Sequence, residues 1–473
     1  MATSTPHAKA PTRHVTRDIA EWAHACAYDK VHPDAIERAK LFLYDSFGCA
    51  LGGSQQEDSE ALVKYAKAIG GAPQCDVFVH NMKTSAPTAA LLNAHMIRAM
   101  DYNDIYWKQD PSHPSDIIPA PMAACQLRGL GGRDLILGTL IAYEVEMRLV
   151  EAGFPGVREY GWHHATLTAF ASPVAAGRVM GLTPEQIQHA IGISGSANCT
   201  LGAVTAGKLT NMKNTVDPMS TRAGVEAAML AELGYSGPEH VFDGKEGITH
   251  VFGHSGNRWD LSILTDALPT CTKCKWRILE CGMKSFPIEA LSHAPLTAMM
   301  KIVKAHDFKP EDVEEIRVEV IARAADILGD PHKYRPDSKE TADHSLPYSL
   351  AVGLVDGMVT PLQFKEERVL DKALIPVMDK VKVVANEEFE ALFPKYQPSR
   401  VTITLKGGKS FVERVDVPKG DPRDPMTEDE ISVKFNALGE PVVGKEKCAK
   451  LRDLIMHIER EDTLDNLFAL MRP

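Results

Sequence analysis

Apolar residues recur every three or four positions through most of the first 265 residues, which is the period of an amphipathic helix. Three long segments, 34–53, 85–100 and 134–153, follow this period closely. The first ends in Gly52-Gly53, a typical helix stop, and the third is apolar on nearly all sides at its start, as a buried helix is. This part of the chain is therefore predicted to be helical throughout.

The pattern changes near Leu268. Segments 313–322 and 399–417 alternate apolar and polar residues, as half-buried strands do. Gly407-Gly408 places a hairpin turn inside the second segment, and the helical segment 346–357 lies between the two. These features predict a smaller domain that contains both strands and helices.

Two capping boxes mark helix starts on either side of that domain. Thr183 to Gln186 includes a proline at the first helical position, and Thr427 to Glu430 follows a proline-rich linker. After the second box the helical pattern returns, and we expect this last segment to pack on the first domain. The predicted fold is mainly α, with an all-helical domain from residues 1–267 and 423–473 and an inserted α+β domain from residues 268–422.

The composition is that of an ordinary soluble globular protein, with 473 residues, 44% hydrophobic and 24% charged, and a net charge of −11. No basic run or basic stripe with interleaved aromatics occurs, so we expect no nucleic-acid ligand. No apolar run approaches the roughly 18 residues that cross a membrane. We expect a cytoplasmic protein; Lys9, Arg13 and Arg17, in an acid-poor segment, leave a mitochondrial transit peptide as the alternative.

Nine cysteines are scattered along the chain, which is typical of free thiols in a reducing compartment. Cys271, Cys274 and Cys281 are close enough in sequence to suggest three ligands of an iron–sulfur cluster or part of a zinc site. A second close cysteine pair, or a histidine pair at metal spacing, is missing from the sequence. We therefore favour ordinary cysteines at a domain junction and predict no metal.

Five segments concentrate side chains of the kind that enzymes use. The most unusual is DYNDIYWKQDPSHPSD, residues 101–116, and the others are 161–164, 207–224, 282–293 and 332–349. Each has a structural alternative, because lysines usually lie at the surface, histidines fit into cores and aspartates cap helices. Together, histidines, carboxylates and cations suit acid–base chemistry on a small polyanionic substrate. Dinucleotide, P-loop and nucleophile-elbow motifs are missing, so chemistry without an organic cofactor is the simplest interpretation.

These segments, in this order, resemble the 2-methylcitrate dehydratase / cis-aconitate decarboxylase family, often called MmgE/PrpD. The matching markers are LYDSFGCALGG, AALLNAHMIRAMDYND, SHPSD, GWHHAT, AGVEAAMLAELG with a lysine eleven residues before its first glycine, MKSFPIEA and ADHSLPYSLAVGLVDG. The resemblance covers about residues 15 to 470. It implies a helical domain built from both chain ends, an inserted α+β lid domain, a homodimer, and an active site between the domains without metal or other cofactor.

The resemblance also assigns functional residues. The implied set is Asp101, His113 and His163 for catalysis, and Lys213, Lys284, Glu289 and Tyr334 for substrate binding. Which catalytic residue is the base and which the acid stays open at this point.

Two details of the resemblance favour the dehydratase branch. Asp101 and His113 are twelve positions apart and are followed by Asp116, as in the dehydratases, whereas decarboxylases have a shorter gap and lack that aspartate. Dehydratases also have a glutamate at the position of Glu289, where decarboxylases have a histidine. Ile105 departs from the dehydratase pattern, which has a hydroxyl there, and this leaves the substrate open.

The expected function is a cofactor-independent lyase that dehydrates a branched tricarboxylate, first of all 2-methylcitrate to 2-methyl-cis-aconitate and also citrate to cis-aconitate. The alternatives within the family are decarboxylation of cis-aconitate to itaconate and epimerisation of an amino-dicarboxylate of the iminodisuccinate type. A non-catalytic helical scaffold is the alternative from a different class, and it would need none of these histidines and lysines.

Overall fold

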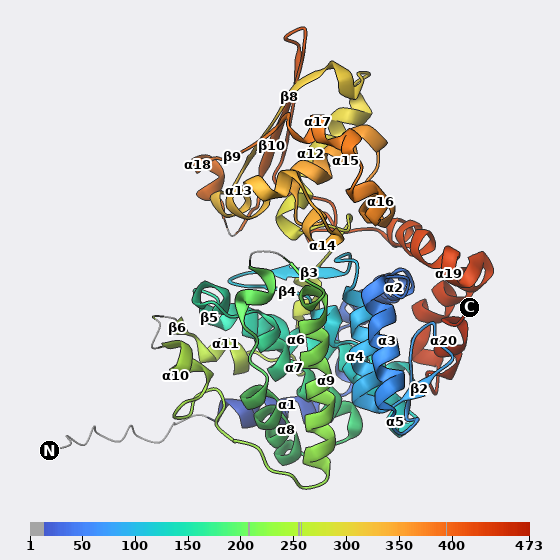
Figure 1. Ribbon diagram of the computed structural model, residues 1–473. Helices are drawn as coiled ribbons and strands as arrows, with labels where there is room; N and C mark the ends of the chain where they lie inside the picture. Colours follow the sequence, from blue (N-terminus) through green and yellow to red (C-terminus); the bar gives the residue numbers. More distant parts are fainter. Residues whose placement is uncertain (1–13, 207–208, 254–255, 257, 394) are drawn as a thin grey trace, which may run out of the picture.

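Two separate hydrophobic cores organise the protein (Figure 1). The computed structural model describes residues 14–206, 209–253, 256, 258–393 and 395–473. The segment with Lys9 and Arg13, which suggests a transit peptide, lies outside the described residues. Among the described helices, none combines the length and the apolar character needed to cross a lipid bilayer.

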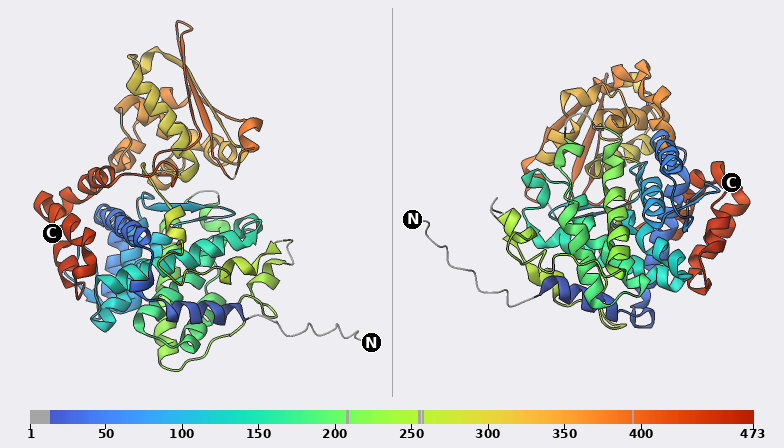
Figure 2. Two further views of the ribbon diagram at one scale, coloured as in Figure 1. Left: turned by 180° about the vertical axis from the view of Figure 1, so that it is seen from behind. Right: turned by 60° about the horizontal axis from the view of Figure 1, so that its bottom comes forward.

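The larger core is built from helices that come from both ends of the chain, as the periodicity predicts. At its centre, α7 packs against α6, α8 and α9, and α19 returns along α2 (Figures 1 and 2). The helices of this core are α1 (Val15–Ala25), α2 (Pro33–Gly53), α3 (Glu57–Ile69), α4 (Ala86–Arg98), α5 (Pro119–Arg128), α6 (Gly132–Ala152), α7 (Ala165–Met180), α8 (Pro184–Ala197), α9 (Met212–Glu232), α10 (Ile248–Gly253), α11 (Leu261–Thr265), α19 (Glu428–Met456) and α20 (Asp465–Leu470).

Both capping boxes that the sequence predicts are present. The Thr183 hydroxyl accepts a hydrogen bond from the Gln186 backbone N–H (3.2 Å), and the Gln186 side chain accepts one from the Thr183 N–H (2.9 Å). Thr427 and Glu430 make the same reciprocal pair at the start of α19. Local sequence alone therefore fixes where these two helices begin.

The smaller core lies under a four-stranded sheet with strand order β11-β10-β8-β9. β8 (Val313–Val320), β10 (Ser399–Leu405) and β11 (Ser410–Val415) are antiparallel neighbours, and they confirm the predicted strands and the turn at Gly408. The short β9 (Val381–Ala385), parallel to β8, is not evident from the sequence. The helices of this part are α12 (His293–Ala305), α13 (Ala322–Leu328), α14 (Lys339–Ala342), α15 (Leu346–Asp356), α16 (Glu366–Val369), α17 (Ile375–Met378) and α18 (Glu387–Glu390).

The first boundary between the two parts differs from the one inferred from the pattern change. Trp276, Ile278, Cys281 and Met283 belong to the larger core, although the sequence places them in the α+β domain. The smaller core begins at Ile288. We therefore propose that the chain enters the lid domain after Met283 rather than at residue 268, and that it returns to the helical domain at residue 423.

The stretch 101–116 contains a short β-hairpin. β3 (Asp104–Trp107) pairs with β4 (Pro111–Ser112) and with β7 (Gly282–Met283). This sheet lies on the face of the helical domain that looks toward the lid domain (Figure 1). Through β3, the sheet joins the segment that leads into the lid domain (β7) to the other strand of the hairpin (β4). Two further two-residue pairings, β1 (Cys75–Asp76) with β2 (Lys83–Thr84) and β5 (Gly153–Phe154) with β6 (Arg258–Trp259), lie elsewhere in the helical domain.

The crossing of α2 and α4 gives a first testable prediction. A Cβ at Gly53 would lie 1.9 Å from the Met96 carbonyl oxygen, so Gly53→Ala has to push the two helices apart. Alanine is the better helix former by about 1 kcal/mol, but overpacking against backbone costs about 1 to 3 kcal/mol. We expect a net loss of stability, measured as the urea unfolding midpoint by circular dichroism. Gly407→Ala is the control, because an added Cβ there meets nothing within 4 Å; equal midpoints for the two variants would contradict the prediction.

Candidate active site

A cavity of about 290 Å³ lies between the helical domain and the lid domain. Both domains line it, and the lining includes six of the seven predicted site residues: Asp101, His113, His163, Lys213, Lys284 and Glu289. Further lining side chains are Arg98, Ile105, Trp107, Arg158, His164, Asp330, His332, Lys333 and His344. The geometry therefore brings together residues that are far apart in the sequence.

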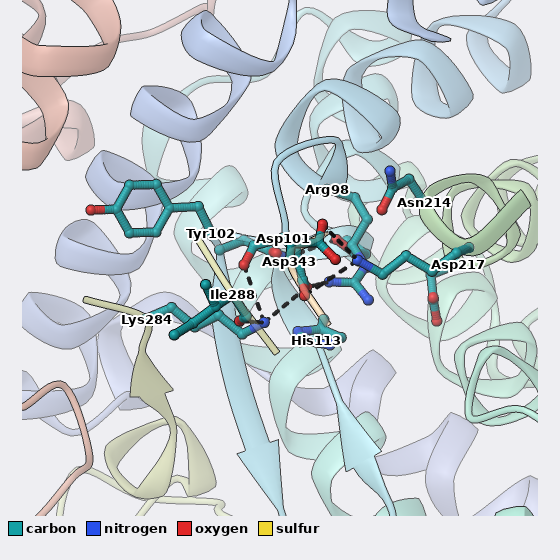
Figure 3. Close-up of polar contacts among 12 residues, drawn as sticks. Arg98, Asp101, Tyr102, His113, Asn214, Asp217, Lys284, Ile288 and Asp343 are labelled. Carbon is teal, nitrogen blue, oxygen red and sulfur yellow. Dashed lines mark hydrogen bonds and ion pairs between the residues drawn. The ribbon is translucent and has the colours of Figure 1, made fainter. Parts of the chain in front are cut away.

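Asp101 lies at the centre of this site, just after α4 (Figure 3). Its backbone is left-handed (φ 50°), a conformation that aspartate tolerates better than most residues, and its N–H donates to the Arg98 carbonyl (2.9 Å). This turn directs the carboxylate toward three cations. Arg98 donates to Oδ1, Lys284 Nζ donates to the same oxygen (2.8 Å), and Lys213 Nζ lies 3.3 Å from Oδ2.

The cations set the charge state of Asp101. Burial alone would raise the pKa of its carboxyl group, but the positive charges of Lys213, Lys284 and Arg98 outweigh burial and hold that pKa well below the usual range. Burial also lowers the pKa of Lys284, against the opposing effect of Asp101. Asp101 is thus an anion that balances a strongly cationic pocket, in the place where a substrate carboxylate would otherwise be expected.

Lys284 is held in place from the helical domain. Its ammonium group also donates to the carbonyl oxygens of Asp101 (3.1 Å) and Ile288 (2.9 Å). Its own carbonyl accepts from Lys434 Nζ of α19 (3.0 Å), which donates to the Tyr102 carbonyl as well (2.6 Å) and pairs with Asp45 of α2 (2.7 Å). Helix α19 therefore holds the backbone on both sides of the Asp101–Lys284 contact, at Tyr102 and at Lys284.

His113 follows the hairpin between Pro111 and Pro114, and proline fixes the backbone on each side of it. Its Nδ1 lies 2.6 Å from the Asp104 carbonyl oxygen. A carbonyl can only accept, so Nδ1 carries the proton and Nε2 carries the lone pair. Burial first, and then Arg98 and Lys284, lower the pKa of His113 well below its ordinary value. It is a neutral imidazole with a basic nitrogen.

His163 has the opposite arrangement of its ring nitrogens. The Ala165 backbone N–H donates to its Nδ1 (3.2 Å), so the proton of the neutral ring is on Nε2. That buried Nε2 has no hydrogen-bond partner among the described residues. Burial and the neighbouring His164 lower the pKa of His163 well below its ordinary value. His163 therefore offers one N–H donor to whatever occupies the cavity.

Glu289 enters the cavity from the first turn of the lid domain. One carboxyl oxygen accepts from the Leu291 N–H (2.7 Å), and its backbone N–H donates to the Asp343 carbonyl (2.9 Å). Burial raises the pKa of Glu289 to about 7, although Lys284 opposes the shift. A carboxyl group that holds its proton near neutral pH is an available acid.

Tyr334 is the predicted residue that does not line the cavity. Its hydroxyl donates to the Val381 carbonyl of β9 (3.0 Å), and its ring packs against the smaller core. The preceding residues His332 and Lys333 line the cavity instead. Tyr334 is thus part of the lid domain's packing, because β9, which the sequence did not predict, captures its hydroxyl.

Several cavity residues were not predicted. Arg98 is the last residue of α4, and its place three residues before Asp101 was a usable signal, because a buried cation at that spacing can pair with the aspartate. His344 and its neighbour Asp343 lie in a segment noted for its polar residues, but nothing in the sequence shows that they face Lys213. His164 was visible only as a second histidine beside His163.

One group of side chains in this site could hold a cation. Donor atoms of His163, His164 and Asp217 lie within 4.8 Å of one another, and His164 Nε2 is 3.4 Å from Asp217 Oδ1. Asp101, Asp343 and His344 are equally close, but the ammonium groups of Lys213 and Lys284 already supply the positive charge there. That no metal is needed stays a prediction, tested below by chelation.

The three neighbouring cysteines do not come together as a ligand set among the described residues. Cys281 is buried and donates weakly to the Ile105 carbonyl (3.5 Å), while Cys271 is exposed and Cys274 is half-buried. The sulfur atoms of Cys271 and Cys274 lie 2.7 Å apart. The cluster interpretation that the spacing allows is therefore not supported by these positions.

Two family models match the chain. The model of the MmgE/PrpD N-terminal domain matches residues 17–260, and that of the MmgE/PrpD C-terminal domain matches residues 286–460. The chain belongs to the MmgE/PrpD family. The resemblance inferred from the sequence markers is thereby confirmed, as is the mainly helical two-part fold.

Curated relatives align with this MmgE/PrpD protein over most of its length. The cis-aconitate decarboxylase of Aspergillus terreus (strain NIH 2624 / FGSC A1156) is 26% identical over 97% of this chain and 96% of its own, and that of Mus musculus is 24% identical over 97% and 93%. The mitochondrial 2-methylcitrate dehydratase of Yarrowia lipolytica (strain CLIB 122 / E 150) is 24% identical over 87% and 81%. These relatives are lyases by name, and the MmgE/PrpD protein is accordingly an enzyme of a lyase family.

The charge balance around Asp101 gives the second prediction. Asp101→Asn leaves Arg98, Lys213 and Lys284 without their shared anion, and removing one partner of a buried pair costs about 3 to 5 kcal/mol. We expect this MmgE/PrpD protein to unfold at clearly lower urea concentration after the substitution, and added tricarballylate to restore more stability to the variant than to the wild type.

The matched control is Asp379→Asn, which removes the partner of Arg335 from an exposed pair of similar length (2.8 Å). Exposed pairs contribute about 0 to 1 kcal/mol. Equal losses in the two variants would show that Asp101 does not balance the charge of the pocket.

Proposed function

We propose that this protein is a lyase that dehydrates a branched tricarboxylate, and that its substrate is 2-methylcitrate, converted to 2-methyl-cis-aconitate. The observation that carries the proposal is Glu289, a buried carboxyl group in the cavity whose pKa is raised to about 7. Dehydration needs an acid for the departing hydroxyl group, and a carboxyl group that holds its proton near neutral pH can supply it.

Binding of the substrate depends on the cations around Asp101. Lys213, Lys284 and Arg98 line the cavity, so carboxylates that enter it meet positive charge from two domains. Negative charge grows next to a carboxylate when the adjacent carbon loses its proton. Fixed, buried cations stabilise this charge more in the transition state than in the ground state.

The two histidines divide the remaining work. His113 Nε2, with its free lone pair, takes the proton from carbon. The electron pair of the broken C–H bond forms the double bond as the C–O bond breaks. His163 Nε2–H donates a hydrogen bond to the departing oxygen, and the Glu289 carboxyl group gives that oxygen its proton, so that water leaves. The imidazolium of His113 then returns the proton to Glu289 through solvent, which restores both groups.

The second candidate function is decarboxylation of cis-aconitate to itaconate. Two observations favour it: the cis-aconitate decarboxylase of Aspergillus terreus aligns over 97% of this chain, against 87% for the Yarrowia lipolytica dehydratase, and Ile105 puts an apolar side chain into the cavity. An acid at position 289 could serve either reaction, since decarboxylation also needs a proton for carbon. The family resemblance favours dehydration, because it implies glutamate at this position in dehydratases and histidine in decarboxylases. From the family resemblance we also propose a homodimer that needs no cofactor, and from the sequence a cytoplasmic location, with a mitochondrial one as the alternative.

The third prediction concerns the reaction itself. With a panel of 2-methylcitrate, citrate, cis-aconitate and an amino-dicarboxylate, we expect 2-methylcitrate to give the fastest turnover, with ultraviolet absorbance rising as the double bond forms and mass analysis showing loss of water. The rate should be the same in the presence of a chelator. Release of carbon dioxide from cis-aconitate would support the second candidate, and loss of activity with the chelator, restored by a metal ion, would contradict the cofactor-free mechanism.

The fourth prediction separates catalysis from packing in His163. We expect His163→Ala to lower kcat by about 100- to 1,000-fold, the usual effect of removing one hydrogen-bond donor from developing charge, with a much smaller loss of thermal stability. Because the pKa of His113 lies well below its ordinary value, kcat/KM should fall at acid pH only below the usual range of histidine titration, and it should fall at alkaline pH as Glu289, with a pKa of about 7, loses its proton. His457→Ala, at an exposed position just after α19, is the control. Near-normal turnover in His163→Ala would make His163 a packing residue.

A further inference from the structure

The lid domain contributes an aspartate–histidine pair to the cavity that the mechanism above does not use. His344 lines the cavity, and its Nδ1 lies 2.5 Å from Asp343 Oδ1. The Asp343 carboxyl group is ionised, since Lys213 and His344 lower its pKa against the effect of burial. Nδ1 is therefore the donor, and Nε2 is left without a protein partner among the described residues.

This pair is held rigidly where the lid domain meets the helical domain. Ser345, the next residue, caps α15 by accepting from the Tyr348 N–H (3.0 Å), and its hydroxyl donates to the Lys333 carbonyl (2.5 Å). The Asp343 carbonyl accepts from the Glu289 N–H (2.9 Å). These contacts fix the backbone on both sides of His344, and the contact of its Nδ1 with Asp343 orients the ring.

Asp343 is shared between the imidazole and two lysines. Its Oδ2 lies 3.5 Å from Lys213 Nζ of α9 and 3.8 Å from Lys339 Nζ of α14, which also donates to the Ala99 carbonyl of the helical domain (2.6 Å). One oxygen each from Asp101 and Asp343 and a ring nitrogen of His344 lie within 4.8 Å of one another. Lys213, Asp343 and Asp101 are thus the charged groups that act on His344.

These charges keep His344 neutral while the cavity holds no anion. Burial first, and then Lys213, lower its pKa to about 4, while Asp343 and Asp101 act in the opposite direction. A substrate carboxylate at Lys213 would cancel that lysine's charge and release Asp343 from it. Both changes favour the imidazolium form, which then has a carboxylate on each side.

We propose that His344, positioned by Asp343, binds a carboxylate of the substrate from the lid side and takes up a proton as the substrate binds. His344 is then a substrate-binding residue that gains its positive charge only in the complex, and Asp343 is its positioning residue. Arg98, Lys213 and Lys284 are cations whether or not substrate is bound, whereas His344 becomes one only in the complex. The inference rests on the proposed function, since it needs a polycarboxylate substrate.

The test is the pH dependence of KM and kcat in His344→Gln and Asp343→Asn, with the tricarboxylate that the wild type turns over. A charge-assisted hydrogen bond contributes roughly 10- to 100-fold in affinity, so we expect KM near pH 6.5 to rise by about tenfold or more in both variants. We expect kcat to change by less than KM. Because wild-type binding takes up a proton, KM should rise as the pH rises. In both variants the slope of log KM against pH should be smaller by up to one. The slope that remains should come from Glu289.

His457→Gln, in an exposed pair with Asp453, is the control for replacing a histidine next to an aspartate. A wild-type KM and slope in His344→Gln overturn the inference and leave the proposed function intact. A loss of kcat with an unchanged slope of KM against pH also overturns it, because His344 would then act in catalysis or packing. If the wild type turns over no tricarboxylate, the proposed function fails first and the inference with it. Asp343→Asn decides the matter on its own if His344→Gln does not fold.

Discussion

A single buried carboxylate, that of Asp101, holds the charged centre of this protein together. Arg98, Lys213 and Lys284 come from α4, α9 and the start of the lid segment, and without an anion between them their mutual repulsion in a buried pocket would drive these elements apart. The left-handed backbone at Asp101 is the local strain that puts the carboxylate where all three cations reach it. Packing of the two cores fixes the positions of these helices and of the lid segment, and the Asp101 carboxylate fixes the cationic side chains that they carry.

The same arrangement separates the functions of the two domains. The helical domain contributes His113, whose Nε2 can accept a proton, and His163, whose Nε2–H can donate a hydrogen bond. One backbone contact to the Nδ1 of each ring sets this difference. The lid domain contributes Glu289 and His344. A site of this kind is complete only when both domains contribute. The curated relatives include both cis-aconitate decarboxylases and 2-methylcitrate dehydratases.

Much of the fold follows from the sequence because it depends on local signals. The helical period, the boxes at Thr183 and Thr427, and the alternation in β8 and β10 act over a few residues and were read correctly. β9 was missed because five residues give too short an alternation, and Tyr334 was misplaced because its partner lies on that strand. The segment of Trp276 and Cys281 was assigned to the wrong domain because hydrophobic side chains do not reveal which core receives them. Family markers pointed to Asp101, Lys213 and Lys284. The pair of Arg98 with Asp101 is local and its spacing was an unused signal, whereas the approach of Asp343 and His344 to Lys213 depends on how α9 and α14 meet, which no local pattern encodes.

The position of Lys434 has a consequence for biosynthesis. The ammonium group of this α19 residue reaches the carbonyl oxygens of Tyr102 and Lys284 and the Asp45 carboxylate, so it joins segments that leave the ribosome at very different times. The first helices and the whole lid are synthesised before α19 exists, yet the backbone beside Asp101 is not fully secured until α19 arrives. A nascent chain that has completed the lid domain therefore still lacks the Lys434 contacts, and its pocket gains them only after nine-tenths of the 473 residues have been made.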